Sequence, residues 1–425
     1  MIMRGLSILL VSTALGAGAI GAAVKLTPAS APQSISFSDD HAWELNRAGP
    51  DSGRVAILLD ALSRTDPVVC DLIADQLGNF WWSGGREGVG RLAAASMTVQ
   101  TAKDSIGGRI TDERAIRRLI SELDGPSACT RRAASKLLGQ SAITTARLNS
   151  LLSDPSANVR ESAALAAGSD DRKEAIPALE RALDDRTPAV AAMAAWALGE
   201  IEDEAAVPAL IRFVRDGDTR VRLAAIWGLG QIEDKRAVRP IIGVMRDPNA
   251  SIRAMAADVL GDIEDEQARG SLESALGSDN DARVRTEAAT SLGEIESASS
   301  APALGRALSD ADIAVRRAAA EALAELDDLR TAPAGLVAAL SSNDPALRHH
   351  AAKALASIAD PATTSAIVGL LSSPDADLRK DAVEGLQEIG TPAAVQAITK
   401  ALSDRDPEVR KAAAEALGDM KDNDS

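Results

Sequence analysis

Residues 188–232 read PAVAAMAAWALGEIEDEAAVPALIRFVRDGDTRVRLAAIWGLGQI, and this stretch contains one pattern written twice. Val190 aligns with Val221 at an offset of 31 residues, and the same offset pairs Trp196 with Trp227. Alanine, leucine, glycine and isoleucine positions follow the same offset. A self-match of this length predicts an array of stacked structural repeats rather than a set of separate globular domains.

The repeat continues through most of the chain. An apolar residue, here called the anchor, recurs every 31 or 32 residues at Val159, Val190, Val221, Ile252, Val284, Val315, Leu347, Leu378 and Val409. Three residues before each anchor stands Ser, Thr, Asp or Asn, the types that accept a hydrogen bond from a free backbone N–H where a helix begins. Four residues past each anchor stands Ala, and eight past it stands Leu in all units but the first. This regularity predicts the face on which neighbouring helices touch.

The repeated motif D-x-x-x-x-V-R-x-x-A-A-x-A-L-G-x-I, as in residues 216–232 or 404–420, resembles the short bacterial HEAT-like repeat of the phycobilin-lyase-like type. The resemblance covers residues 128–420. It implies an all-α fold, a right-handed α-solenoid (superhelix) of two-helix HEAT-like repeats with a period of about 31 residues. It also implies that the second helix of each pair lines the concave side.

The N-terminal part departs from the repeat. Arg4, the uncharged run from Gly5 to Val24 and the small residues Ala29-Ser30-Ala31 predict a signal peptide over residues 1–31, with an uncleaved anchor as the alternative. Residues 32–48 are predicted to be a flexible lead-in, 49–127 divergent helical repeats that cap the array, 128–420 the array itself, and 421–425 a disordered tail. We therefore expect an exported, periplasmic protein, or one anchored in the inner membrane and facing the periplasm.

The charge composition of the chain limits the classes of partner that we expect. The chain carries 46 Lys and Arg against 62 Asp and Glu, a net charge of −16, and this field repels phosphate backbones and anionic lipid headgroups. We expect no nucleic acid partner, membrane contact only through the N-terminal segment if it stays uncleaved, and a monomer. Only 2% of the residues are aromatic, so the core must consist mostly of Ala, Leu, Ile and Val.

The chain has two cysteines, Cys70 and Cys129. An even count in an exported protein permits one disulfide. Two repeats separate these positions, however, and helix layers about 8–10 Å apart place their Cα atoms beyond bridging distance. We therefore predict two buried, unbridged thiols.

Arginine follows the anchor in most units, and aspartate lies five residues before it. A guanidinium can bond two acceptors at once, so we expect each arginine to join an inter-helix turn to the acidic group of its own or the next repeat. A row of arginines for anionic ligands is the alternative. The residues of this structural ladder are Arg160, Arg222, Arg253, Arg285, Arg316, Asp154, Asp185, Asp216, Asp247, Asp279 and Asp310.

The sequence offers no catalytic or metal-binding constellation. It has no Gly-rich phosphate loop, HExxH motif or CxxC pair, and its three histidines lack a plausible nucleophile partner. The deoxyhypusine hydroxylases, a related HEAT-like family, bind two irons through His-Glu pairs, and this chain has none. One doublet, His349-His350, cannot assemble a four-ligand site. We expect solvated histidines, no metal, no cofactor and no catalytic residue.

The positions that vary from repeat to repeat are the remaining indication of a functional surface. Residues two, six and ten past the anchor share one helix face, which is charged and solvated in the last six units. Three earlier units place Leu and Trp there instead, which predicts an exposed apolar cluster that binds a partner. Ordinary packing of the tryptophans is the alternative. The predicted partner-binding residues are Trp196, Trp227, Leu165 and Leu223, with the acidic flanks Glu200, Asp258 and Asp262, and Glu161 also on the rim.

These features predict a non-catalytic protein–protein interaction scaffold. Its concave surface would present the Trp/Leu patch and the acidic flanks to a protein or peptide partner that is basic or amphipathic. The alternative is an enzyme or enzyme accessory of the HEAT-like family, either bilin-lyase-like or the sensory part of a membrane regulatory peptidase system. The triplet Phe80-Trp81-Trp82 is expected to pack over the open end of the solenoid.

Overall fold

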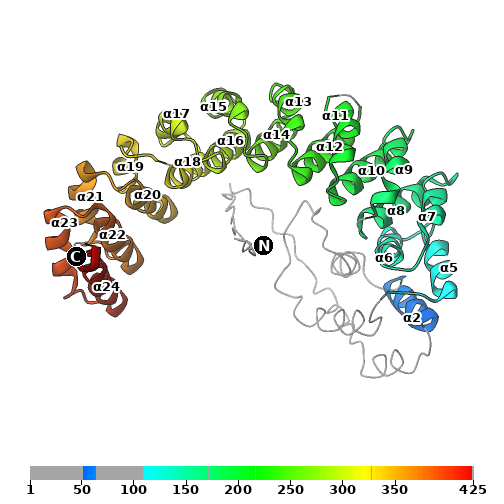
Figure 1. Cartoon of the computed structure of the whole chain (residues 1–425), viewed down its shortest axis with the longest axis horizontal. Coiled ribbons are helices and arrows are strands. Elements are labelled where there is room, and N and C mark those ends of the chain that lie inside the picture. Colours follow the sequence, from blue (N-terminus) through cyan, green and yellow to red (C-terminus); the bar gives the residue numbers. More distant parts are fainter. Residues whose placement is uncertain (1–50, 64–108, 171, 216, 327, 424–425) are drawn as a thin grey trace, which may run out of the picture.

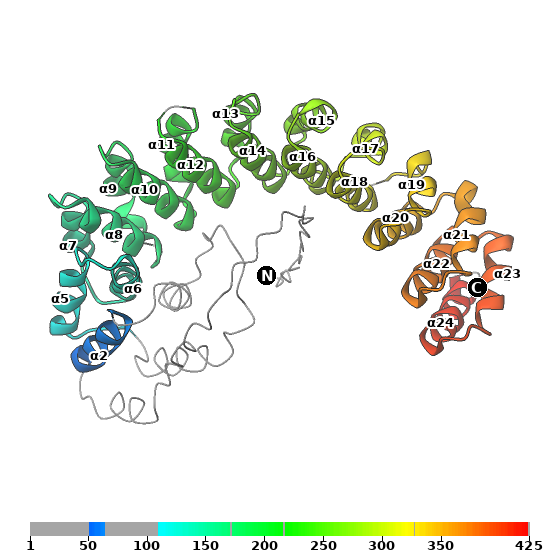
Figure 2. The same cartoon turned by 180° about the vertical axis from the view of Figure 1, so that it is seen from behind.

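Helices alternate between the two layers of an arch (Figure 1). This computed structural model describes residues 51–63, 109–170, 172–215, 217–326 and 328–423. Each repeat contributes one outer and one inner helix, and the inner helices line the concave side in both views (Figures 1 and 2). The architecture is the α-solenoid of two-helix units that the repeated sequence predicts.

The helices follow the predicted period. The outer layer consists of α5 (Glu113–Glu122), α7 (Thr145–Leu151), α9 (Ile176–Ala182), α11 (Val207–Phe213), α13 (Val238–Ile242), α15 (Arg269–Ser278), α17 (Ala301–Ala307), α19 (Ala334–Ala339), α21 (Thr364–Leu370) and α23 (Pro392–Ala401). The inner layer consists of α6 (Ala128–Gly139), α8 (Ala157–Gly168), α10 (Pro188–Glu200), α12 (Thr219–Ile232), α14 (Ala250–Asp262), α16 (Ala282–Glu294), α18 (Ile313–Glu325), α20 (Pro345–Ile358), α22 (Ala376–Ile389) and α24 (Pro407–Asn423). The helix α2 (Asp51–Ser63) precedes the first pair.

The inner helices begin at the predicted cap residues. The side chain of Asn249, for example, accepts a hydrogen bond of 2.9 Å from the backbone N–H of Ser251. Ser156 is an exception, because its hydroxyl makes no cap hydrogen bond. Its own N–H donates instead to the Asp154 carboxylate at 2.8 Å. The aspartate five residues before the anchor therefore orders the turn that leads into the inner helix.

The acidic turns after several inner helices adopt a left-handed backbone. Glu202, Glu233, Glu264, Glu296 and Asp328 have φ angles between 49° and 57°. Residues other than glycine rarely adopt this backbone conformation, because their β-carbon crowds the neighbouring carbonyl oxygen. In four of these turns a short 3₁₀ helix follows and leads directly into the next outer helix: η3 (Glu204–Ala206), η4 (Lys235–Ala237), η5 (Glu266–Ala268) and η6 (Ala298–Ser300). These turns reverse the chain between repeats.

Successive inner helices pack along the alanines four residues past the anchors. Eight of these side chains are 0% exposed and the ninth is 1% exposed, namely Ala163, Ala194, Ala225, Ala256, Ala288, Ala319, Ala351, Ala382 and Ala413. Leucines one turn further on, such as Leu198, Leu229 and Leu260, are 0% exposed. Each buried leucine contributes about 2 kcal/mol of hydrophobic stabilisation. A continuous seam of small and branched apolar side chains therefore forms the core.

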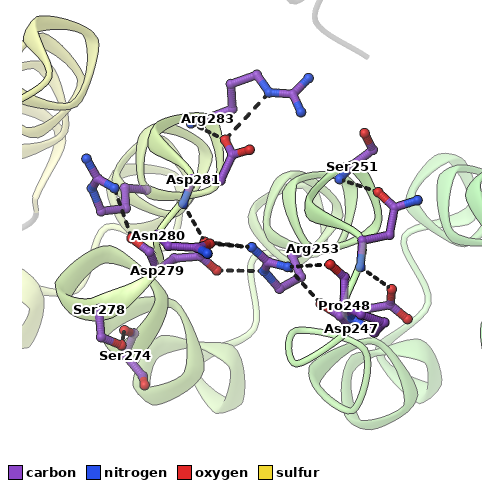
Figure 3. Close-up of polar contacts among 12 residues, drawn as sticks. Asp247, Pro248, Ser251, Arg253, Ser274, Ser278, Asp279, Asn280, Asp281 and Arg283 are labelled. Atoms are coloured by element: carbon purple, nitrogen blue, oxygen red, sulfur yellow. Dashed lines mark hydrogen bonds and ion pairs between the residues drawn. The ribbon is translucent and has the colours of Figure 1, made fainter.

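An arginine–aspartate ladder joins successive repeats (Figure 3). Arg253 donates from Nε and Nη2 to the two carboxylate oxygens of Asp279, in the next repeat, at 2.7 and 2.8 Å. Its Nη1 donates to the backbone carbonyl oxygen of Asp247 at 2.7 Å. Asp279 in turn accepts the N–H of Asp281 at 2.9 Å. One guanidinium thus fixes the turn of its own repeat and the turn of the next. The same two-bond pairing occurs in Arg160–Asp185, Arg285–Asp310 and Arg379–Asp404. Arg222 reaches Asp247 through Nη2 alone, because its Nε donates to the backbone oxygen of Val214.

The ladder is interrupted in the described chain. Arg316 donates only to the backbone oxygens of Asp310 and Ala311, because Ser342 stands where the next aspartate would be. The unit of α10 has Ala191 at the arginine position, and the matching Asp216 lies outside the described residues. The α10–α12 joint therefore relies on a different contact, which belongs to the candidate site.

The predicted state of the cysteines is wrong for Cys129, which is disulfide-bonded. Cys70 is the one other cysteine of the sequence and lies outside the described residues. The prediction assumed regular stacking, but α2 packs against both α5 and α6. Because Cys129 is in the first turn of α6 and Cys70 follows the end of α2 by seven residues, that assumption fails in the N-terminal units.

Other predictions on the N-terminal part fall outside the described residues. These are the signal peptide of residues 1–31, the lead-in of 32–48 and the Phe80-Trp81-Trp82 triplet. The predicted disorder of the tail is wrong for residues 421–423, which continue α24, and residues 424–425 lie outside the description. None of the helices in the described segments has the length and the hydrophobicity that a membrane span requires.

Replacing Arg253 by Gln tests the ladder. The Arg253 and Asp279 side chains are 11% and 9% exposed, so the change leaves a nearly buried carboxylate without its cation. We expect a loss of about 3 kcal/mol in the free energy of unfolding, measured by urea denaturation. The control is Arg283→Gln, whose side chain is 67% exposed, and we expect it to cost less than about 0.5 kcal/mol. Equal effects of the two variants would contradict a stabilising ladder.

Candidate partner-binding surface

Two stacked tryptophans occupy the α10–α12 joint, where Ala191 stands at the position of the ladder arginine. The rings of Trp196 in α10 and Trp227 in α12 have centroids 6.3 Å apart and planes inclined by 14°. Offset stacking of this kind contributes about 1 kcal/mol beyond the burial of the ring surfaces. The stack therefore stabilises the contact between α10 and α12 where the arginine is missing.

Glycines of the preceding helices make room for the two rings. A β-carbon on Gly168 would lie 3.0 Å from Cζ3 of Trp196, and one on Gly199 would lie 3.0 Å from Cζ3 of Trp227. The backbones are also close, because the same β-carbon on Gly199 would lie 2.5 Å from Cα of Gly228. The glycine near each inner helix end thus has a packing role at these two joints.

The expectation that the whole apolar cluster is exposed is wrong for two residues. Leu165 and Trp196 are 5% and 8% exposed, whereas Trp227 and Leu223 are half-buried. The prediction assumed that the residues six positions past the anchor face solvent. In the structure the large side chains at these positions pack against the adjacent inner helix. Of the predicted apolar cluster, two side chains therefore belong to the core and two are partly accessible to solvent.

The buried rings nevertheless line a cavity. A cavity of about 340 Å³ opens between α6, α8, α10 and α12, and Leu165, Met193, Trp196 and Trp227 form its apolar wall. Its described lining comes from the inner helices, which run along the concave side of the arch (Figure 1). Its volume is in the range of pockets that hold small molecules or large side chains. We call this cavity the tryptophan pocket.

The polar rim of the tryptophan pocket differs from the predicted one. Glu161 lines the pocket as expected, but Leu223, Glu200, Asp258 and Asp262 are not among its lining residues. Arg131 and Arg132 from α6 and Arg220 from α12 are there instead. Sequence reasoning missed these arginines. The adjacent pair in TRRAASKLLGQ, residues 130–140, was the available signal, but the variable helix face was compared only in the units from Val159 onward.

The acidic flanks belong to a separate surface on α14, α16 and α18. We define it as the acidic strip, and its members are Asp258, Asp262, Glu287, Glu294 and Glu325. No ion pair within 4.0 Å joins these carboxylates to a base of the described residues. The strip therefore gathers carboxyl groups without a cationic partner on the inner helices.

Crowding within the acidic strip is visible in its pKa values. Desolvation raises the pKa of Glu294 to about 8, and repulsion from Asp262 and Asp258 adds to the effect. Desolvation followed by repulsion from Asp258 raises the pKa of Asp262 to about 7. Both side chains still expose a substantial fraction of their surface, so water screens part of this effect. Nearby positive charge from a partner would favour the ionised form of each.

Glu200 belongs neither to the lining of the tryptophan pocket nor to the acidic strip. It lies at the end of α10, one turn past Trp196, and is half-buried. Desolvation and, to a smaller extent, the charge of Glu202 raise its pKa to about 7, against a small opposing effect of Lys136. The predicted acidic flank therefore contains at least one carboxylate that titrates near neutral pH.

The histidine doublet is not a simple solvated pair. Nδ1 of His349 lies 2.8 Å from Oδ2 of Asp381, and Nε2 lies 3.3 Å from Oδ2 of Asp375. Burial alone would lower the pKa of His349, but its hydrogen bonds to Asp381 and Asp375 raise it above the usual value. His349 thus joins α20 to the next repeat where Arg348 donates only to the backbone of Ser342. Across the described residues, no group of three or more His, Cys, Asp or Glu side chains is placed to hold a metal ion.

The geometry above is that of a repeat protein whose inner helices line a concave face. The family model for HEAT repeats matches residues 144–222, 210–293, 278–334, 301–375 and 366–425, which together exceed half of the 425 residues. The chain belongs to the HEAT-repeat family. No curated protein sequence matches it.

Among similar solved structures, importin beta supports the α-solenoid fold. Importin beta is similar with a TM-score of 0.60 at 16% identity, over 91% of this chain and 60% of importin beta, so this chain spans less than two thirds of that protein. An engineered protein is similar with a TM-score of 0.46 at 22% identity, over 83% of this chain and 99% of that one. A chain in the CpcE–CpcF complex of phycocyanin lyase from Nostoc sp. PCC7120 has a TM-score of 0.34 at 24% identity, over 53% of this chain and 92% of that one.

The raised pKa of Glu294 predicts a pH-dependent stability. Its usual value is 4.5 and its value in the folded chain is about 8, so the folded state binds more protons than the unfolded state between these limits. Stability is therefore greatest at low pH within this window and falls as the pH rises through about 8.

The isosteric change Glu294→Gln removes this effect. We expect the variant to match the wild type near pH 5 and to be more stable by about 0.5 kcal/mol near pH 8, a figure reduced for solvent screening. Thermal unfolding at both pH values measures the difference. The control is Glu388→Gln at the same slot of α22, ten residues past its anchor. A stability gain that is the same at both pH values would contradict the argument.

Proposed function

We propose that this HEAT-repeat solenoid is a non-catalytic scaffold that binds a protein or peptide segment on its concave face, with a bulky apolar side chain of the partner in the tryptophan pocket. The observation that carries the proposal is a cavity of about 340 Å³ walled by Trp196, Trp227, Leu165 and Met193. Aromatic side chains in a concave pocket are frequent anchors of protein interfaces.

The polar lining supports binding rather than covalent chemistry. Ser135 donates its hydroxyl hydrogen to the backbone oxygen of Arg131 at 2.7 Å, and Ser162 donates to that of Leu123 at 3.5 Å. A nucleophilic serine needs an adjacent base, and neither hydroxyl has one among the described lining residues. The arginines and Glu161 provide charge and hydrogen bonds at the rim, which is the role of polar groups in a binding site.

We also propose that the protein is exported. The predicted signal lies outside the described residues, so the support comes from Cys129, which is disulfide-bonded. Structural disulfides persist in oxidising compartments and are rare in the cytosol. Together with the pattern of residues 1–31, this favours the periplasm.

The pocket can be blocked without removing a buried ring. Ala192 is half-buried and lines the pocket two residues past its anchor, so Ala192→Gln fills the cavity with a flexible polar side chain. Ala254→Gln is the matched control, because Ala254 holds the same slot in α14, is also half-buried and lies outside the pocket lining. Replacing Trp196 itself would confound the result by destabilising the fold by about 3–5 kcal/mol.

Segments selected on the wild-type protein from a displayed library of random peptides provide the probe. We expect the synthesised peptides to bind the wild type and the Ala254→Gln variant alike, and to bind the Ala192→Gln variant at least about tenfold more weakly. Fluorescence polarisation measures the affinity. Equal binding to both variants, or no enrichment on the wild type over Ala192→Gln, would overturn the pocket as the binding site.

A further inference from the structure

The two flanks of the tryptophan pocket differ in charge. On the α6 side, Arg131 and Arg132 line the cavity. Nη1 of Arg131 donates to the backbone oxygen of Gly125 at 2.7 Å, and no ion pair within 4.0 Å joins this guanidinium to a carboxylate of the described chain. A hydrogen bond to a carbonyl leaves the positive charge uncompensated. Arg131 therefore places a positive charge without a carboxylate partner on the α6 side.

The centre of the pocket is close to neutral. Arg220 on the α12 side is paired with Asp218, with Nε 3.0 Å from Oδ1. Glu161 on α8 is close enough to help raise the pKa of Arg220, so its negative charge also acts there. The apolar wall therefore lies between a cationic edge and a region where charges cancel.

Beyond α12 the sign of the charge reverses. Asp258 and Asp262 belong to α14, the next inner helix, and the acidic strip continues through Glu294 on α16. Asp262 has its pKa raised by desolvation and then by Asp258, which is the expected result of carboxylates that lack a cation. From α6 to α14 the concave face thus passes from the unpaired guanidinium of Arg131, through apolar residues of α8 to α12, to carboxyl groups that lack a cationic partner.

We propose that the occupant of the tryptophan pocket is an amphipathic segment with a fixed charge polarity: acidic residues beside its apolar anchor on the α6 side, and lysine or arginine on the α14 side. This inference rests on the proposed function, because it specifies the partner of the same pocket. Charge complementarity on both sides of an apolar anchor selects one binding direction, since the reversed segment would oppose like charges.

The separation of the flanks sets the length of the segment. Neighbouring packed helices are about 8–10 Å apart, so four steps from α6 to α14 span roughly 30–40 Å. A helical segment rises about 1.5 Å per residue and therefore needs about 20–27 residues to reach both flanks. Shorter segments would contact the pocket and one flank only.

Binding should also release protons. A lysine or arginine placed beside Asp262 favours its ionised form, and this carboxyl has a pKa of about 7 in the free protein. The observed binding enthalpy at neutral pH should then depend on the ionisation enthalpy of the buffer. A segment that occupies the pocket alone should not show this dependence.

The test uses the full chain and peptides of about 24 residues, selected from a displayed random library on the wild-type protein and synthesised. We expect selected peptides to have a bulky apolar residue with Asp or Glu on one side and Lys or Arg on the other. A peptide of the same composition with its two charged ends exchanged should bind about tenfold more weakly. Calorimetry in buffers of different ionisation enthalpy should show proton release.

A pair of isosteric variants tests the acidic flank. Asp258→Asn with Asp262→Asn should weaken the selected peptides about five- to tenfold. Glu384→Gln with Glu388→Gln is the matched control at the same two slots of α22, and should change affinity by less than about twofold. The loss should shrink at high salt, where exposed charges are screened.

The outcomes separate this inference from the function on which it rests. Peptides that lose affinity with Ala192→Gln but show no charge order, and that bind both acidic variant pairs equally, would overturn the polarity and leave the scaffold proposal standing. Peptides that respond to the Asp258 and Asp262 variants but bind Ala192→Gln as they bind Ala254→Gln would overturn the pocket, and the polarity with it. Failure to enrich any segment on the wild type over Ala192→Gln would overturn both.

Discussion

The close contact between successive inner helices is the constraint on which this molecule depends. Alanines at 0–1% exposure lie along the entire seam, from Ala163 to Ala413, and a larger side chain at any of them would force two helices apart. Because each repeat contacts only its neighbours, a local spacing is propagated along the array. The arginine ladder depends on the same spacing. Arg253 reaches Asp279 of the next repeat and the turn of its own repeat only because α14 and α16 lie this close.

The α10–α12 joint shows how the same constraint produces a surface. Without an arginine at position 191, this joint is held by the stack of Trp196 and Trp227, and glycines at 168 and 199 accommodate the rings. The rings are too large to be covered completely by the seam. The cavity between α6 and α12 is the space that remains beside them. A stabilising contact and a concave apolar pocket thus arise from the same two side chains.

Charge is arranged differently on the two sides of the inner helices. At the turns, carboxylates such as Asp185, Asp279 and Asp310 have arginine partners that hold their pKa values below the usual range. On the strip from α14 to α18 the carboxylates have no such partner, and desolvation raises their pKa values. The paired charges order the fold. The carboxyl groups of the acidic strip do not stabilise the fold at neutral pH. A cationic group of a partner is therefore the interaction that they lack.

The sequence by itself determined whatever repeats with the period: the helix pairs, the cap residues such as Asn249, the alanine seam and the chemistry of the ladder. These features depend on residues within one repeat or on one spacing between identical neighbours, so a single pattern specifies all of them. Only the tertiary structure decided the burial of Leu165 and Trp196, the arginine rim from α6 and the disulfide bond of Cys129. Each of these depends on how an atypical unit packs against its neighbours, and the regular pattern contains no information about that packing.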